Sequence, residues 1–324
     1  MLFYLIKRLF GIVPMIIGIT LVSFLVMQLA PGDPGSVAAD LNPKVSPEMI
    51  QKMRAHYGLD QPVYIQYFTW LKKLAVLDFG KSFQPDGGAV LDKVAKALPV
   101  TLVMNVIGLF VVLLLAIPIG VAAARWQNGV FDRTSTILVF LGFAAPSFWL
   151  GLMAMMYFGV YLGWLPISGI SSYGAETWPW WQRVGDWAIH LTLPITIGII
   201  GSLAGMSRYM RTTMLETIRQ DYITTARAKG CGEFRVLTRH ALANALLPVI
   251  TILGLSLPGL IGGSVIMESM FAIPGMGKLF YDGVMMRDYP LIMGILTLGA
   301  VLTLLGNLLA DIGYALVDPR IRYA

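Results

Sequence analysis

The side chains best suited to bind another molecule gather in the segment 208–245. Within it, Asp221 precedes Thr224–Ala226, and Gly230 follows. An acid at a helix start and Lys229 near its end suit the helix dipole, and Gly230 suits the left-handed position after a helix. We expect two short helices here, the first too short to be stable alone, so that it must pack on the protein. The seven basic residues of the segment are Arg208, Arg211, Arg219, Arg227, Lys229, Arg235 and Arg239.

Catalytic and metal-binding chemistry have no matching pattern in the sequence. His56, His190 and His240 fall in different predicted segments, and Cys231 is the single cysteine. A thiolate metal site or a disulfide framework is therefore excluded, and neither a His-Glu-x-x-His nor a Gly-x-Ser-x-Gly sequence occurs. We expect no enzymatic activity, no cofactor and no metal in this chain.

A phosphate-binding loop is also missing. The nearest approach is Gly277-Lys278, but Leu279 follows where Ser or Thr is needed, and Ala272 stands where the first Gly belongs. The chain is therefore not expected to bind nucleotide by this device, and any uphill transport needs another source of energy.

The composition is that of a membrane protein. Of 324 residues, 56% are hydrophobic and 13% are charged, and the mean hydropathy is +0.71. Six stretches have the roughly 17–25 mostly apolar residues that cross a bilayer as a helix. We predict an all-α protein that crosses the membrane six times. The predicted spans are Leu9–Leu29, Pro99–Ala124, Ile137–Leu162, Ile189–Ser207, Leu246–Met267 and Tyr289–Ala310.

The first of these stretches is 21 residues long, which exceeds the roughly 7–15 of a signal-peptide core, so we expect it to remain as a helix.

If both termini are inside, 13 Lys and Arg lie on the inside, against 3 in the short outside loops. The positive-inside rule therefore predicts an N-in and C-in arrangement. Because the net charge of +6 is concentrated on one side, binding of nucleic acid is not expected.

Four regions follow from these spans. Residues 1–30 hold the first transmembrane helix, 31–98 an extracytoplasmic helical loop, 99–316 a five-helix core with the segment 208–245, and 317–324 a cytoplasmic tail. In the loop we expect a helix from Pro47 to Gly58 and another from Pro62 to Leu77. The second is rich in aromatic residues and suits either the membrane interface or docking of an outside partner.

The predicted spans contain almost no ionisable residues, although ion-coupled carriers usually need them there. The polar residues singled out in the spans are Gln28, Asn105 and Asn307, with Asn244 near the edge of the fifth span. We interpret the asparagines as hydrogen-bonding links between helices. A gate driven by a separate motor is favoured, and a self-powered carrier or channel stays as the alternative.

The basic segment resembles a known family. Thr224–Ala226, followed after three residues by Gly230, resembles the Glu-Ala-Ala…Gly loop of permeases of ATP-binding cassette (ABC) importers. The surrounding residues resemble the dipeptide/oligopeptide/nickel branch, and in particular its subunit with a long first outside loop. The other matching motifs are His240–Leu242, Asn244–Pro248, Ala30–Pro34, Tyr57–Asp60, Asp78–Gly80 and Asp318–Arg320.

This resemblance implies a type I ABC importer permease in the bacterial or archaeal cytoplasmic membrane. It implies a second, different permease subunit, two ATPases that bind ATP and Mg, and an extracytoplasmic solute-binding protein, with lipid around the spans. It also implies that a cytoplasmic helix transmits the motion of the ATPases. The residues to which this role is assigned are Asp221, Thr224, Thr225, Ala226, Arg227, Ala228 and Gly230.

Two departures from the general family pattern occur. Thr224 and Thr225 replace the Glu and the first Ala, and Pro248 lies further from Gly230 than in the shorter general pattern. A salt bridge from that Glu is therefore not expected. The cargo implied by the branch is a di- or oligopeptide, and nickel or another metal chelate is the alternative.

Overall fold

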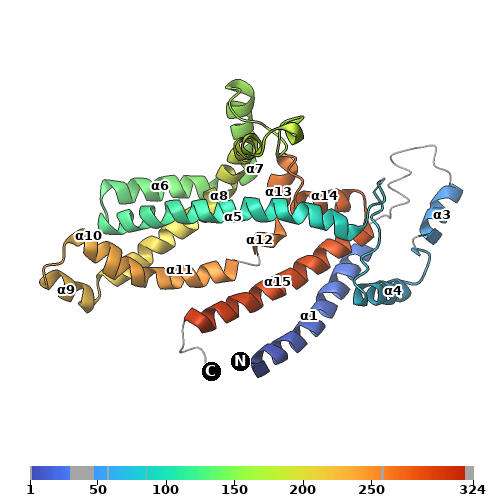
Figure 1. Cartoon of the computed structure of the whole chain (residues 1–324), viewed down its shortest axis with the longest axis horizontal. Helices are drawn as coiled ribbons and strands as arrows, with labels where there is room; N and C mark the ends of the chain where they lie inside the picture. The colour runs from blue at the N-terminus through green and yellow to red at the C-terminus, as the bar shows by residue number, and fades with distance from the viewer. Residues whose placement is uncertain (1, 30–46, 57, 85, 257–258, 318–324) are drawn as a thin grey trace. The chain divides into compact units, whose positions relative to one another are not determined.

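The computed structural model describes most of the chain, and the described residues are largely helical (Figure 1). The predicted motifs Ala30–Pro34 and Asp318–Arg320 lie outside them, as do Tyr57 and the tail from residue 318. The described residues are 2–29, 47–56, 58–84, 86–256 and 259–317.

The chain forms two compact units that are interleaved in sequence. The first unit consists of Met1–Thr101, Ile261–Val265 and Pro274–Ala324. The second consists of Leu102–Leu260 and Ile266–Ile273.

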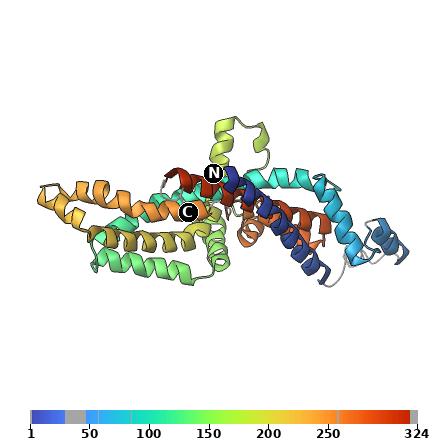
Figure 2. The same ribbon diagram turned by 90° about the horizontal axis from the view of Figure 1, so that it is seen from below.

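In the first unit, the long apolar helices α1 and α15 lie side by side (Figure 1 and Figure 2). Phe24 of α1 packs on Tyr67 of α4 with ring centroids 5.3 Å apart, and the Tyr67 hydroxyl lies 3.2 Å from that of Thr20. The helices predicted from Pro47 and from Pro62 are confirmed as α3 and α4. The helices of this unit are α1 (Leu2–Leu29), α3 (Pro47–His56), α4 (Val63–Ala75), the start of α5 (Val90–Arg125), α14 (Met276–Met285) and α15 (Tyr289–Val317).

A buried carboxylate connects the loop before α5 to the start of α15. Asp288 is fully buried and accepts hydrogen bonds from the Ser82 hydroxyl and from the backbone N–H of Phe83 (2.9 Å). Its second oxygen accepts a bond of 3.1 Å from the N–H of Leu291, in the first turn of α15. Asp288 therefore supplies a cap to a helix whose first N–H groups would lack partners.

The first turn of α14 requires glycine for a steric reason. A Cβ on Gly277 would lie 2.6 Å from the backbone of Ser264 and Val265. The residue before Gly277 makes a polar contact: the N–H of Met276 donates to the Thr101 hydroxyl at 2.8 Å. The sequence Pro274-Gly275-Met276-Gly277 is thus a packed helix start.

In the second unit, α8 packs against both α6 and α11. The π-helical segments η1 and η3 and the short helices α9 and α10 complete it, and α12 and α13 contribute residues to both units. The bounds are α6 (Val130–Ala144), α7 (Ser147–Ala154), η1 (Met155–Tyr161), η2 (Ala175–Thr177), α8 (Trp180–Ile218), α9 (Asp221–Ala228), α10 (Glu233–Arg235), η3 (Val236–Ala241), α11 (Leu242–Ser256), α12 (Gly259–Gly262) and α13 (Val265–Met270).

Five described helices are long and apolar enough to cross a membrane, and a bent pair brings the count to six. The predicted span Ile137–Leu162 is not one straight helix, because α6 and the helix after it are bent by 96°. Pro146 lies at this break, where it has no N–H to donate and its ring disfavours a helical residue before it. The fifth predicted span is also interrupted, because residues 263 and 264 between α12 and α13 are not helical.

Candidate partner-binding surface

The helix α9 is held on the second unit by two inward side chains. Ile223 is fully buried and Ala226 is 8% exposed, and both belong to a cluster with Met214 of α8 and Val236 and Leu237 of η3. Burial of one isoleucine side chain stabilises by about 1.5–3 kcal/mol. This contact explains how an eight-residue helix, unstable by itself in water, keeps its structure.

The end of α9 has the hydrogen bonds of a Schellman motif. The Cys231 N–H donates to the Ala226 carbonyl at 3.2 Å, and the Gly230 N–H donates to the Arg227 carbonyl at 2.9 Å. Gly230 has a φ of +81°, so the predicted left-handed position is confirmed. The turn directs the chain from α9 into α10 and onward to the apolar helix α11.

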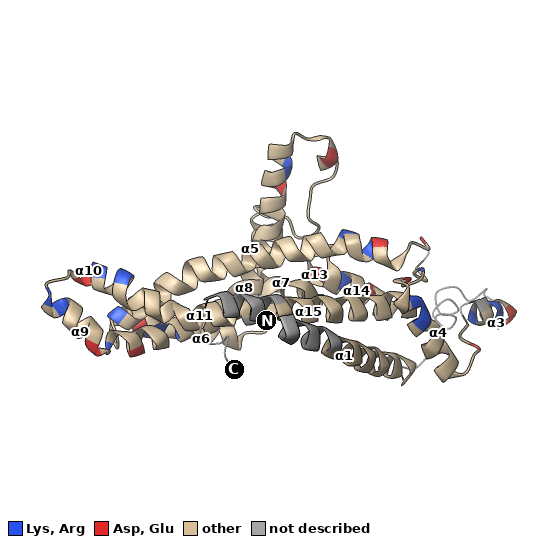
Figure 3. Ribbon diagram, turned by 60° about the horizontal axis from the view of Figure 1, so that its bottom comes forward, with Lys and Arg blue, Asp and Glu red and all other residues tan. Residues whose placement is uncertain are grey.

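The outer face of α9 is polar and open. Among the residues predicted to transmit motion, Ala226 is buried and serves as a packing residue. Charged residues gather around α9 and α10 (Figure 3), whereas the middle stretches of α5 and α8, residues 97–124 and 187–207, contain no Asp, Glu, Lys or Arg. The exposed members of the predicted set are Asp221, Thr224, Thr225, Arg227, Ala228 and Gly230.

Two side-chain contacts that the sequence did not reveal fix α9 to its neighbours. Arg227 donates two hydrogen bonds to Glu233, from Nε to Oε2 (3.1 Å) and from Nη2 to Oε1 (2.9 Å). These bonds raise the pKa of the Arg227 guanidinium above its usual value. On the other side, Asn244 donates to the Tyr222 hydroxyl at 3.0 Å. Each contact joins residues of two different helices, and their spacing in the sequence does not predict either one.

Apolar or small residues recur at helical spacing in the second helix and predict one inward face, and this prediction is only partly correct. The predicted face consists of Phe234, Leu237, Thr238, Ala241, Leu242 and Ala245. Leu237, Ala241 and Ala245 are buried as expected, but Phe234 is 77% exposed and Val236 is fully buried. The reason is that residues 236–241 form a π-helix, which has a wider turn than the α-helix and shifts the phase of the buried residues.

A second of the seven basic residues, Arg211, forms an ion pair with a buried carboxylate. Arg211 of α8 donates from Nε and Nη2 to Asp132 of α6 at 2.6 and 2.7 Å. Asp132 is 4% exposed and also accepts a bond of 2.8 Å from the Asn128 N–H. This two-fold contact fixes the ends of α6 and α8 to each other.

Asn105 and Asn244 make the predicted links between helices. Asn105 donates to the Leu260 carbonyl at 2.7 Å, and Asn244 donates to the Tyr222 hydroxyl.

Comparison with known proteins identifies the family. Residues 116–323 match the binding-protein-dependent transport system inner membrane component, and residues 1–105 match the N-terminal part of such membrane components. The chain is 43% identical over 320 residues to the oligopeptide transport system permease protein AppB of Bacillus subtilis, with 99% of each chain covered. It is 38% identical over 323 residues to the oligopeptide transport system permease protein OppB of Haemophilus influenzae, with 100% of each covered.

The fold is also found in a solved structure. A chain of the MetNI methionine ABC transporter in inward-facing conformations aligns with a TM-score of 0.54 and 18% identity, covering 70% of this chain and 97% of that one. The prediction of an all-α, six-span, type I ABC importer permease is confirmed. Such a subunit is not an enzyme and works with ATPase and substrate-binding components, which leaves the self-powered alternative unsupported. The chain belongs to the family of inner membrane components of binding-protein-dependent transport systems.

Proposed function

We propose that this chain is one of two different permease subunits of a peptide importer and forms half of the translocation pathway. Relatives named as oligopeptide permeases match it from end to end, and this similarity supports a peptide cargo over a nickel or other metal chelate. Two partner ATPases would bind ATP and Mg, and an extracytoplasmic binding protein would deliver the peptide.

The observation that carries the mechanism is the geometry of α9. Its inner side is anchored by Ile223 and Ala226, and its outer side presents Asp221, Thr224 and Thr225 to the cytoplasm. A force applied to α9 is therefore passed to the helices on which it packs, α8 and η3. We assign to α9 the role of a coupling helix that binds a groove of an ATPase, with Gly230 at the turn that sets its direction.

The cargo is tested with the assembled importer in liposomes containing ATP, together with its binding protein. Uptake of a labelled tripeptide or pentapeptide is compared with uptake of a nickel–histidine chelate. We expect ATP-dependent accumulation of the peptide and none of the chelate; the reverse result would exclude the peptide assignment. Native mass measurement of the same assembly should find one copy of this chain for every two ATPases, and two copies would contradict the heterodimer.

A further inference from the structure

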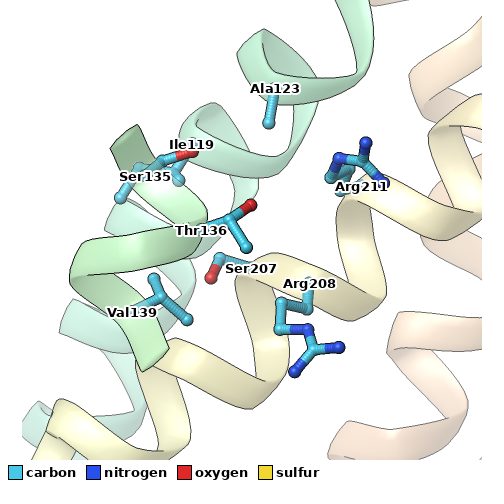
Figure 4. Close-up of a pocket in the computed structure, with 8 residues that line it drawn as sticks. All are labelled: Ile119, Ala123, Ser135, Thr136, Val139, Ser207, Arg208 and Arg211. Carbon is cyan, nitrogen blue, oxygen red and sulfur yellow. The ribbon is translucent and has the colours of Figure 1, made fainter. Parts of the chain in front are cut away.

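Polar side chains between the described helices mark the depth at which an apolar span ends. In the second unit, a recess beside α8 is lined in part by Ser207 and Arg208, where the predicted apolar stretch of that helix ends (Figure 4). In the first unit, the Gln28 amide of α1 donates to Gln66 of α4 at 3.0 Å. The span of α1 ends one residue later, at Leu29. The helix α4 therefore meets α1 at the extracytoplasmic boundary of the membrane (Figure 1).

The side of α4 that packs on α1 reaches below that boundary. Tyr67 is buried in one cluster with Phe24 of α1 and Ile292 of α15. Phe24 lies about 7–8 Å from Leu29, the extracytoplasmic end of the α1 span, at about 1.5 Å per residue. Ile292 lies about 5 Å from Tyr289, where the α15 span begins, at the same rise. Both helices thus place Tyr67 at the depth of about 5–10 Å to which amphipathic helices enter a membrane interface.

The contacts of two consecutive residues show which face of α4 is turned toward the membrane interior. Gln66 reaches Gln28, at the extracytoplasmic end of α1. The Tyr67 hydroxyl instead donates to the Ile17 carbonyl at 3.3 Å and lies 3.2 Å from the Thr20 hydroxyl. Thr20 is about 12 Å deeper along α1 than Gln28, at about 1.5 Å per residue. The face of α4 that bears Gln66 is therefore the outward one, and the opposite face is turned toward the bilayer.

This inward face carries two exposed aromatic side chains. Residues two apart on an α-helix point about 200° from each other, so Tyr64 and Phe68, on either side of Gln66, both lie opposite to it. Tyr64 and Phe68 are one turn apart and are 65% and 59% exposed. Lys73, about two turns after Gln66, is exposed on the outward face. An apolar inward face and a cationic outward face are typical of a helix that lies in a membrane interface.

We propose that α4 is an interfacial helix that inserts Tyr64 and Phe68 among the acyl chains of the extracytoplasmic leaflet. Lys73 faces the lipid headgroups and the water above them. Val26 of α1 lies within about 5 Å of the same boundary and is 63% exposed, as expected of a side chain that faces lipid. An outside protein would have to enter the leaflet to reach Phe68, so lipid is the occupant that fits this face. The insertion attaches the loop between α1 and α5 to the membrane surface.

The depth of α4 is tested on the importer, assembled with its partner subunits in liposomes and labelled at a single cysteine with a polarity-sensitive fluorophore. The natural thiol is removed with Cys231→Ser, and the probe is placed on Phe68→Cys or, as the matched control on the same helix, on Lys73→Cys. We expect a lipid with a nitroxide near its headgroup to quench the Phe68→Cys probe severalfold more than iodide in the water does. The Lys73→Cys probe should show the reverse order and a redder emission, because it faces water.

Tyr64→Cys is the second probe of the inward face, and it should behave as Phe68→Cys does even if Phe68→Cys fails to assemble. Equal quenching by iodide of the inward and outward probes would overturn the proposal, because α4 would then stand in water. Stronger lipid quenching of Lys73→Cys would contradict the orientation. Inward probes that neither reagent quenches would be covered by protein, which also excludes lipid. Protection of the inward probes from iodide by added solute-binding protein would instead identify α4 as a docking site for that protein.

Discussion

Gly230 sets the direction of the chain at the turn between α9 and α10. Its φ of +81° lies in the left-handed region, and a Cβ there would meet no atom within 4 Å. Any penalty on substitution therefore comes from the backbone and not from crowding. A β-branched residue in this conformation costs about 1–3 kcal/mol, which favours another path for the chain between α9 and α10.

Gly230→Val should reduce the peptide imported per ATP hydrolysed by severalfold, because α9 would leave the turn at a different angle. Gly232→Val is the matched control, since Gly232 has an ordinary extended conformation with φ −61° and ψ 146° and no atom within 4 Å of its Cβ. Uptake and phosphate release are measured on the same liposomes. Full coupling of Gly230→Val in an intact assembly would argue against the role given to this turn.

Asp288 is the second residue whose effect can be separated from its surroundings. Asp288→Ala leaves the Ser82 hydroxyl and the first turn of α15 without their acceptor, and we expect a loss of about 2–3 kcal/mol in stability. Asp282→Ala removes a partly exposed partner of Lys278 only six residues away and should cost less than about 1 kcal/mol. Unfolding midpoints of the two purified variants decide this, and equal midpoints would contradict the capping role.

At the scale of elements, α9 is a short helix whose inner and outer faces have different roles. The inner face belongs to a core shared with α8 and η3, and the contacts Arg227–Glu233 and Tyr222–Asn244 hold its two ends. Half-exposed ion pairs contribute roughly 0–1 kcal/mol each, so the position of α9 depends mainly on buried Ile223. The outer face is left free for a partner.

Thr225→Arg tests that outer face. Thr225 is exposed and donates to the carbonyl four residues earlier, at 3.0 Å, so its replacement should not unfold α9. A bulky charge should nevertheless weaken binding of the ATPases by tenfold or more, measured by co-purification. The control is Thr212→Arg on α8, because Thr212 is also exposed and makes the same local bond, at 3.1 Å. Equal recovery of ATPases with both variants would place the interface elsewhere.

For the whole molecule, the important feature is a set of membrane helices whose described charged groups lie near their ends. Asp132 and Arg211 pair near the ends of α6 and α8. Arg208 lies one turn before Arg211, and the five other basic residues of segment 208–245 follow it in the chain. Burying an unpaired charge in a bilayer is costly, so a carrier that binds ions needs such groups deeper in its spans. This distribution fits a gate that is moved from the cytoplasm.

The purified chain alone, reconstituted in liposomes, should hydrolyse no ATP and accumulate no peptide under a proton or sodium gradient. The complete assembly measured in parallel supplies the positive control. Accumulation by the isolated chain would show that it carries its own means of coupling.

The sequence determined the class of the protein, because length, hydropathy and charge bias act over many residues and do not depend on packing. It also located α9 and the left-handed Gly230, whose signals are local: an acid at the start, a base at the end and a glycine after it. Only the tertiary structure decided the break at Pro146, the phase shift of the π-helix η3, and the pairing of Asp132 with Arg211. The Asp132–Arg211 pair joins helices distant in sequence, and Pro146 marks a possible break without setting its angle of 96°. The spacing of apolar residues along the chain does not show which face of a helix another helix will bury.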